Sequence, residues 1–282
     1  MKKLIAAALV GTMVLTMAGC GSKQAASTDG GSKTESEAGS DAAAADSGEK
    51  KTLRVGMECA YAPYNWTQSD DSNGAVPISG SSDYAYGYDV MMAKHICDEL
   101  GWNLEIVKMD WDSLPTSVSS GAIDCAIAGQ SITAKRLESV DFTDPYYYAS
   151  IVTLVKKDGP YKDAKGLADL KGATATSQIN TVWYDTCLDQ IEDVNKLPAY
   201  ETTGTMLVSL ESGACDLICT DQPTAMAACV AYPDMEMLDF SSADDNYQVS
   251  DEEINIGISV KKGNQELVDE INEKGFSSLK ED

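Results

Sequence analysis

The chain has 282 residues, of which 43% are hydrophobic, and a formal net charge of −24 at pH 7 with a single histidine. A surface this acidic repels nucleic acid and anionic lipid and attracts cationic solutes, although acidity also serves solubility alone, so no nucleic acid is expected as a partner. One histidine excludes multi-histidine metal sites, and we expect neither a metal nor a cofactor.

Residues 1–19 are typical of a secretory signal peptide. Two lysines precede an apolar run over 4–17, which at about 14 residues is too short for a stable membrane span. The small pair Ala18-Gly19 before Cys20 resembles a bacterial lipobox, with Met17 where leucine is usual. We expect cleavage before Cys20 and a lipid anchor on it; a plain signal cut elsewhere, with Cys20 incidental, is the alternative. Loss of the two lysines changes the charge from −24 to −26.

Residues 20–50 are predicted to be a disordered tether. From Gly21 to Lys50 the sequence holds no aromatic and no branched apolar residue, so it cannot bury enough surface to offset its ordering entropy. The remaining residues, about 230, suffice for one large or two medium domains. No second apolar run of spanning length follows, and we expect nothing after residue 20 to enter the membrane.

Strand and helix patterns alternate after residue 50. Strands are predicted over 52–57, 104–108 and 123–128, and helices over 89–100 and 113–119. Gly101 should end the longer helix, and Pro115 is tolerated in the first turn of the shorter one. This alternation predicts an α/β fold with largely parallel sheets and helices on both faces.

An internal repeat predicts two similar lobes. The segment from Ser120 to Ala128 is echoed by the segment from Ser212 to Thr220, each with a glycine, an aspartate and then an apolar strand. Ligands of open α/β sheets bind beyond the carboxyl ends of strands, so the polar residues that follow each copy are candidate ligand groups.

Those two strand ends have complementary chemistry. Ser131 and Thr133 precede Arg136 at a predicted helix start, and a guanidinium with a helix N-terminus suits a carboxylate. Asp221, after the second copy, suits an ammonium. An α-amino acid carries both groups and would bridge the lobes. The alternatives are a surface ion pair for Arg136 and a helix cap before Pro223 for Asp221.

Several motifs carry a resemblance to the family 3 extracellular solute-binding proteins, the receptors of polar amino-acid ABC importers. They are Tyr61-Ala62-Pro63-Tyr64, Gly87-Tyr88-Asp89-Val90, Trp111-Asp112, Ser131-Ile132-Thr133-Ala134-Lys135-Arg136 and Phe142-Thr143-Asp144-Pro145-Tyr146-Tyr147. The resemblance implies a two-lobed, periplasmic-binding-protein-like (type II) clamshell with interlobe crossovers near 148–151 and 240–242. It implies lobe 1 over 51–148, lobe 2 over 149–242 and a return to lobe 1 over 243–282.

Carried over by position, the resemblance implies eight ligand contacts. Tyr61 and Trp111 flank the ligand side chain, and Asp221 holds its α-ammonium. The carboxylate is held by Ser131, Arg136 and Thr181, with the backbone of Gly129 nearby. Glu58 reaches the end of the side chain, its alternative being a solvated carboxylate. Asn180 stands at a position where the family usually has glycine.

The implied function is a monomeric, extracytoplasmic receptor that passes an amino acid to the permease of an ABC importer by lobe closure. The expected ligand is neutral or cationic, with glutamine, arginine and lysine ahead of glutamate and aspartate, because Glu58 and Asp221 repel a further carboxylate. A periplasmic dehydratase-like enzyme and a sensory module on the same fold are the alternatives.

The polar insertion over 68–82 is either a lip over the cleft or a plain surface loop. Most of the seven cysteines after Cys20 are expected to be small core residues, with one disulfide possible.

Overall fold

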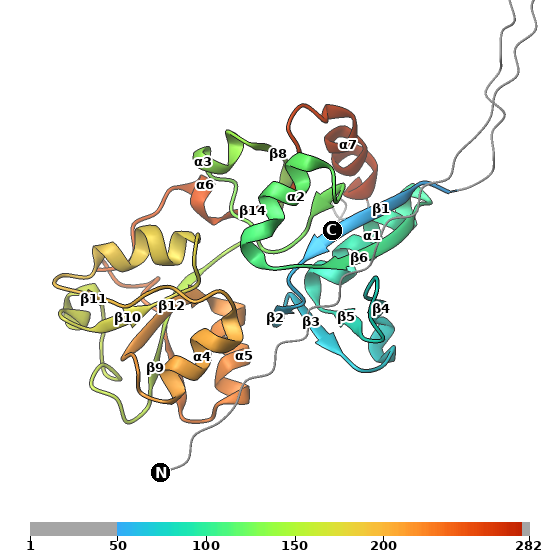
Figure 1. The fold of residues 1–282 in the computed structure, drawn as a ribbon. Coiled ribbons are helices and arrows are strands. Elements are labelled where there is room, and N and C mark those ends of the chain that lie inside the picture. The colour runs from blue at the N-terminus through green and yellow to red at the C-terminus, as the bar shows by residue number, and fades with distance from the viewer. Residues whose placement is uncertain (1–49, 278–282) are drawn as a thin grey trace, which may run out of the picture. The chain divides into compact units, whose positions relative to one another are not determined.

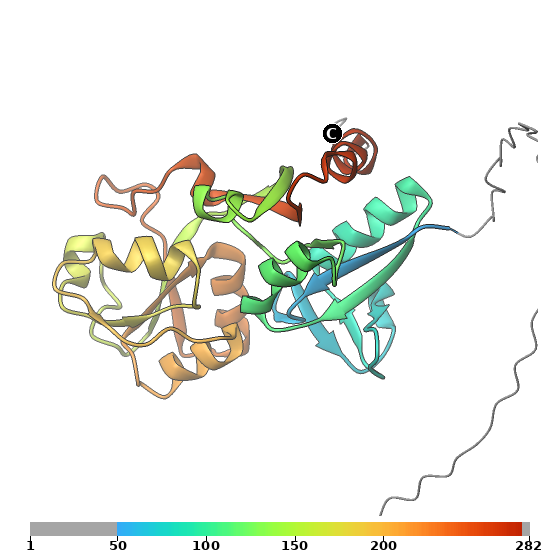
Figure 2. The same cartoon turned by 45° about the horizontal axis from the view of Figure 1, so that its top comes forward.

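The computed structural model describes residues 50–277, which form two lobes (Figures 1 and 2). The predictions for the signal peptide, for Cys20 and for the tether up to residue 49 lie outside the described residues. Within 50–277 no helix combines the length and the apolarity that a membrane crossing requires.

The first lobe is built on a five-stranded sheet in the order β6-β1-β7-β14-β8. Its strands are β1 (Thr52–Met57), β6 (Asn103–Lys108), β7 (Cys125–Ala126), β8 (Val140–Tyr148) and β14 (Asn255–Lys261). The helices are α1 (Tyr88–Leu100), α2 (Leu114–Ser120), α3 (Ala134–Leu137) and α7 (Gln265–Glu270). One apolar core joins this sheet to α1, α2 and α7, with Val55, Ile96 and Ile258 fully buried.

The second lobe repeats this plan in the order β11-β10-β12-β9-β13. Its strands are β9 (Ile151–Lys156), β10 (Thr174–Thr176), β11 (Asn195–Lys196), β12 (Leu217–Asp221) and β13 (Met235–Leu238). The helices are α4 (Thr203–Glu211), α5 (Gln222–Ala231) and α6 (Asp251–Ile254), with the π-helix η4 at Trp183–Cys187. Two apolar clusters form this core, one on each face of β12, whose residues Leu217 and Ile218 belong to different clusters.

The predicted helices and strands are present, but the length of one strand and the direction of some strands differ from the prediction. Helix α1 ends at Gly101, which has φ 68 and caps it as expected. The predicted strand over 123–128 is wrong in length, since only Cys125–Ala126 pair as a strand. The parallel prediction holds for three strands of each sheet, because β14 is antiparallel to β7 and β8, and β9 is antiparallel to β12 and β13.

The internal repeat is confirmed down to single hydrogen bonds. Gly121 and Gly213 adopt φ 79 and φ 75 after helices α2 and α4. The side chain of Asp124 accepts from the backbone N–H of Arg54 at 2.8 Å, and that of Asp216 accepts from the N–H of Thr174 at the same distance. In each lobe the aspartate therefore ties the incoming strand to its neighbour just before the sheet pairing begins.

Two neighbouring chain segments connect the sheets. The chain leaves the first sheet at Tyr148 and enters the second at Ile151, and it returns through α6 into Asn255. The N–H of Ala149 donates to the carbonyl of Ile254 at 2.9 Å, so the two passages are hydrogen-bonded to each other. Tyr247 packs in a second-lobe cluster on the way back. The exact division at 148/149 and 242/243 stays a prediction.

The insertion over 68–82 extends the first lobe. A small sheet, β2-β3-β5-β4, combines β2 (Ala60–Tyr61), β3 (Asn65–Gln68), β4 (Val76–Pro77) and β5 (Tyr84–Tyr86). After β4, Ile78 forms a parallel bridge with Ile106, and the N–H of Ser79 donates to the carbonyl of Ile106 at 2.8 Å. The insertion thus covers the outer edge of β6, which hides backbone groups that an open edge would expose.

Among residues 50–277 all seven cysteines are free thiols, and six of them are buried. This agrees with their expected role as small core residues.

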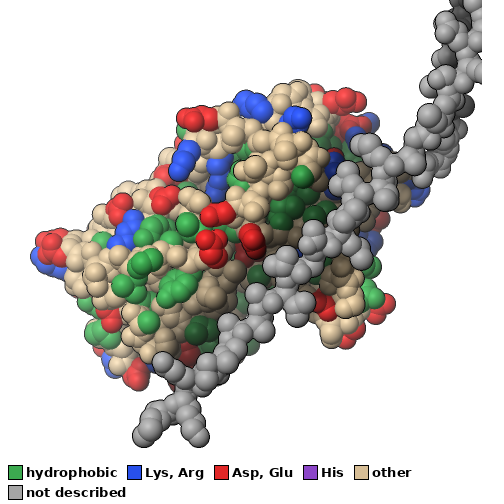
Figure 3. Space-filling model, in the orientation of Figure 1, with side chains coloured by type: hydrophobic (Ala, Val, Ile, Leu, Met, Phe, Trp, Pro, Cys, Tyr) green, Lys and Arg blue, Asp and Glu red, His purple; other side chains and the backbone are tan. Residues whose placement is uncertain are grey.

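On the surface, acidic and basic side chains are interspersed over the visible face of both lobes (Figure 3).

Candidate functional site

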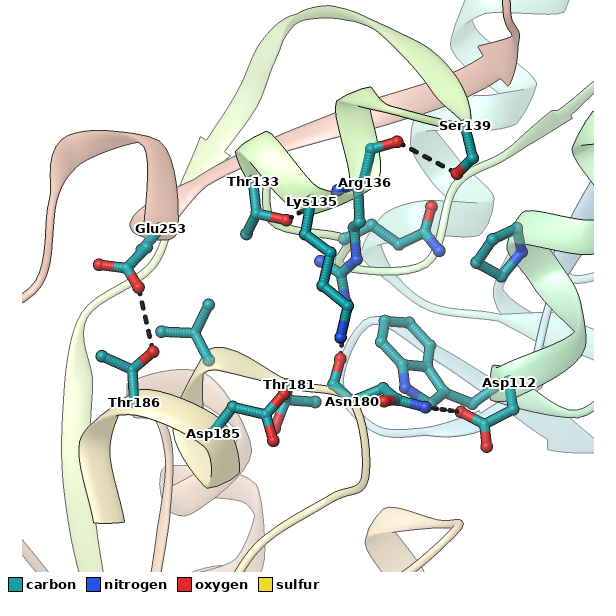
Figure 4. A pocket seen from close by; sticks show the side chains of 14 residues that line it. Asp112, Thr133, Lys135, Arg136, Ser139, Asn180, Thr181, Asp185, Thr186 and Glu253 are labelled. Carbon is teal, nitrogen blue, oxygen red and sulfur yellow. Dashed lines mark hydrogen bonds between the residues drawn. The ribbon is translucent and has the colours of Figure 1, made fainter. Parts of the chain in front are cut away.

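Two cavities lie between the lobes, and Trp111 lines both. The first, of about 420 Å³, runs between the segment around Arg136 and the segment 180–186 of the second lobe (Figure 4). The second, of about 560 Å³, is lined by Glu58, Lys108 and Glu201, among others. Each cavity is therefore lined by residues of both lobes, and the Trp111 side chain borders both cavities.

Arg136 crosses from the first lobe to the second. Thr133 caps α3 by accepting from the backbone N–H of Arg136, and the arginine side chain extends toward Asn180 (Figure 4). Its guanidinium donates to the carbonyl of Ser131 and to the carbonyl of Asn180, each at 2.9 Å. Both partners are neutral, and a guanidinium has five N–H donors, so three are left unengaged by the part of the chain that the structure describes.

Burial lowers the pKa of Arg136 to about 10, an effect that the nearby charge of Asp185 opposes. The group stays cationic at neutral pH, and its side chain is half-buried and lines the first cavity. A partly desolvated cation gains more from an anionic partner than a fully hydrated surface arginine does.

The second-lobe loop contacts the first lobe through Asn180. This residue has φ 54, in the left-handed region, which explains why glycine is usual at the position. Its side-chain amide donates to Asp112 at 2.8 Å across the interface. Beside it, the hydroxyl of Thr181 donates to the carbonyl of Gln178 at 2.7 Å and accepts from the N–H of Tyr184. Thr181 thus stabilises its own loop, just before η4.

Asp221 serves two structures at once. It is the N-cap of α5 and accepts from the N–H and the hydroxyl of Thr224, both at 2.9 Å, so the expected alternative of a helix cap is correct. It also accepts hydrogen bonds from Tyr61 at 2.5 Å and from Tyr64 at 3.1 Å, both from the opposite lobe. The residue is 1% exposed.

Aromatic side chains of the first lobe lie along the interface with the second lobe. Tyr61 stacks on Tyr64 with ring centroids 4.7 Å apart. A Cβ on Gly129 would lie 2.8 Å from the Tyr61 ring, and Gly129 has φ 67, so a side chain there meets both a clash and backbone strain. The indole N–H of Trp111 donates to the carbonyl of Ile179 at 2.9 Å, another interlobe contact. The Arg136 guanidinium carbon lies 5.4 Å from the centroid of Trp111.

Glu58 is buried, with 4% of its surface exposed, so the alternative of a solvated carboxylate is wrong. Its Oε2 accepts from the amide of Gln178 at 3.1 Å, while Oε1 has no hydrogen-bond partner among residues 50–277. Burial raises the pKa of Glu58 to about 7, with the Gln178 hydrogen bond lowering it and the charge of Asp89 raising it. The same Gln178 amide donates to the carbonyl of Glu201 at 3.0 Å.

Of the eight expected residues, Tyr61, Asp221, Trp111 and Arg136 make direct contacts between the lobes, and Glu58 meets Gln178 there. Ser131 is buried and pairs with Ile256 at the start of β14, while Gly129 and Thr181 contact their own lobes. Sequence reasoning missed the interlobe hydrogen bonds of Tyr64 and Asp112. Both lie inside recognised motifs, which was the only signal available.

Comparison with known proteins agrees with this geometry. The profile of the bacterial extracellular solute-binding proteins, family 3, matches residues 53–282. An arginine-binding extracellular protein of Bacillus subtilis is 31% identical over 144 residues, which are 51% of this chain and 50% of that protein, so the match spans half the relative. A probable histidine-binding protein of Neisseria gonorrhoeae is 28% identical and covers 97% of this chain and 89% of that protein.

A solved structure shares the fold. An amino acid ABC transporter substrate-binding protein from Streptococcus pneumoniae, bound to L-arginine, has a TM-score of 0.69 and 27% identity, covering 82% of this chain and 88% of that chain. The two-lobed α/β architecture is that of an extracellular receptor that binds a small solute. The chain belongs to family 3 of the bacterial extracellular solute-binding proteins.

Proposed function

We propose that this protein binds a polar α-amino acid between its lobes and delivers it to the permease of an ABC importer. Two interlobe contacts carry the proposal: Arg136 of the first lobe donates to Asn180 of the second, and Asp221 of the second lobe, a group of opposite charge, accepts from Tyr61 of the first. Relatives bearing the names of arginine-, histidine- and cystine-binding proteins support an amino acid as the ligand.

In this proposal each end of the amino acid has its own partners. Arg136, Ser131 and Thr181 hold the carboxylate together with the backbone of Gly129, and Asp221 holds the ammonium. Since Tyr61 and Tyr64 donate to Asp221 here, the incoming ammonium takes the place of at least one hydroxyl at that carboxylate. Contacts made in both lobes stabilise the closed form, and the paired passages at Ala149 and Ile254 act as the hinge.

The ligand side chain is proposed to be cationic. The second cavity is lined by the carboxylates of Glu58, Asp110 and Glu201 and by one lysine, Lys108. Lys108 already donates to the hydroxyl of Thr67 at 3.1 Å. An ammonium or guanidinium here would give Oε1 of Glu58 a partner, whereas a further carboxylate would meet three acidic side chains, of which Glu58 is partly ionised near neutral pH.

A thermal-shift screen of the twenty amino acids tests the function. Ligand at 100 times its dissociation constant should stabilise the protein by about 2.7 kcal/mol. Arginine or lysine should give the largest shift, glutamine a smaller one, and glutamate and aspartate the smallest. Absence of a shift with any amino acid contradicts the function, and glutamate in first place contradicts only the charge assignment. Turnover of a bound ligand, measured as product formation, would instead favour the dehydratase-like alternative.

We further propose that the receptor is a monomeric, non-catalytic lipoprotein, anchored at the extracytoplasmic face through Cys20 after removal of residues 1–19. Replacing Cys20 by alanine should release the protein from the membrane fraction into the medium or the periplasm, without changing its melting temperature. Cell fractionation with immunoblotting measures this. Unchanged membrane retention would contradict the anchor, and a Cys229→Ala variant controls for loss of a thiol as such.

A further inference from the structure

We infer that Asp89 is a positioning residue that holds together the segments of the first lobe which the proposed function assigns to ligand binding. Asp89 is 0% exposed and lies in the first turn of α1, outside both cavities. It is therefore not a ligand contact itself. This inference rests on the proposed function. It extends the site to a buried residue that does not face the ligand.

Three chain segments meet at this one residue. The N–H of Asp89 donates to the carbonyl of Tyr64 at 2.8 Å. Its Oδ2 accepts from the amide of Asn65 at 2.7 Å, and its Oδ1 accepts from the hydroxyl of Tyr146 at 2.6 Å. The aromatic loop and the end of strand β8 are thus attached to the start of α1.

Asn65 passes the connection on to the segment that carries Glu58. Its Oδ1 accepts from the N–H of Cys59 at 2.8 Å, and Asn65 is 0% exposed. Cys59 has φ 51, a left-handed conformation that a residue with a side chain adopts only when its surroundings hold it there. The hydrogen bond from Cys59 to Asn65 therefore fixes the turn directly after Glu58.

Tyr146 passes the connection on to Gly129. The N–H of Gly129 donates to the Tyr146 hydroxyl at 3.3 Å, while that hydroxyl donates to Asp89. One carboxylate thus sets the turn beside Glu58 on one side and the backbone of Gly129 on the other. Burying a carboxylate costs free energy unless its oxygens accept hydrogen bonds. Here the two oxygens of Asp89 accept from two donors on separate chain segments, Asn65 and Tyr146.

The directions of these hydrogen bonds allow the network to be tested by swapping the carboxylate and the amide between positions 89 and 65. In Asp89→Asn, one acceptor oxygen becomes an amide that faces the amide of Asn65, so Asn65 must turn and lose Cys59, or one donor stays unpaired. Combining Asp89→Asn with Asn65→Asp restores every hydrogen bond. The new carboxylate at position 65 accepts from Cys59 and from the new amide at position 89, and the oxygen of that amide accepts from Tyr146.

The experiment measures L-arginine and L-glutamine binding by calorimetry, and amide hydrogen exchange at Cys59 and Gly129. Asp89→Asn should weaken binding at least tenfold and speed exchange at both amides, and the double variant should restore both within about threefold of the unaltered protein. Tyr146→Phe should affect Gly129 and leave Cys59 protected, and it replaces Asp89→Asn if that variant does not fold.

Opposite results separate the inferences. Unchanged exchange at Cys59 and Gly129 in Asp89→Asn overturns the positioning role, as does a double variant that folds but restores neither exchange nor binding. A fall in melting temperature with unchanged binding reduces Asp89 to a stabilising residue and also overturns it. If the unaltered protein binds no amino acid, the proposed function fails, while the exchange measurement still decides the positioning role.

Discussion

Replacement of Arg136 by alanine will weaken amino-acid binding by about 100-fold or more, while the ligand-free fold is retained. Removing one partner of a buried, hydrogen-bonded charge pair costs about 2–5 kcal/mol of binding free energy. The guanidinium has N–H donors that no other described residue engages besides its bonds to Ser131 and Asn180, and its side chain is half-buried. Isothermal titration calorimetry with L-arginine measures the loss.

Two further variants make this test specific. Arg136→Lys should recover only part of the affinity, because an ammonium cannot reproduce the two parallel hydrogen bonds of a guanidinium. Arg54→Ala is the matched control, since Arg54 pairs with Asp124 at 2.7 Å and lines neither cavity. It should lower stability and leave affinity unchanged. Affinity at the level of the unaltered protein in both Arg136 variants would reject the carboxylate assignment.

Affinity for L-arginine will fall as the pH falls from 8 to 5.5, by about 30-fold, because the proposed site places the cationic side chain beside ionised Glu58 and the pKa of that residue is raised to about 7. Binding should release a proton near neutral pH, which calorimetry in buffers of different ionisation enthalpy detects. Glu58→Gln should remove most of the pH dependence and weaken arginine more than glutamine. Arginine affinity that is independent of pH in the unaltered protein would place the cationic group away from Glu58.

The same ionisation sets a stability effect of known sign. The pKa of Glu58 is raised from 4.5 to about 7 in the folded protein. The contribution of Glu58 to the free energy of unfolding is therefore fully present below pH 4.5 and is lost as the pH rises through 7. Glu58→Gln should therefore raise the free energy of unfolding at pH 8 by up to about 3 kcal/mol. The difference from the unaltered protein should vanish below pH 4.5. Denaturant titration of the ligand-free protein at both pH values measures it.

The sequence alone predicted those features that depend on local geometry. Glycine ends α1 and α2, and Gly213 follows the last turn of α4, the counterpart of α2, because glycine enters the left-handed region without strain. The repeated Gly and Asp of the two lobes recur because each aspartate caps the same strand junction, at Arg54 and at Thr174. Family membership also followed from motifs that are contiguous in the chain.

Other features depended on which distant segments meet. The antiparallel strands β9 and β14 could not be predicted, because their pairing is set by the passages between the lobes and not by their own residues.

By itself the sequence determined the candidate charges of the site, Arg136 and Asp221, and the α/β class that carries them, since these depend on residue type and spacing. Only the tertiary structure decided that tyrosine hydroxyls meet Asp221 from the opposite lobe, that Glu58 is buried, and that Asn65, Asp89 and Tyr146 form one network. The reason is that burial and hydrogen-bond partnership are properties of packed neighbours. Residues separated by 57 positions, as Asp89 and Tyr146 are, become neighbours only when the fold has formed.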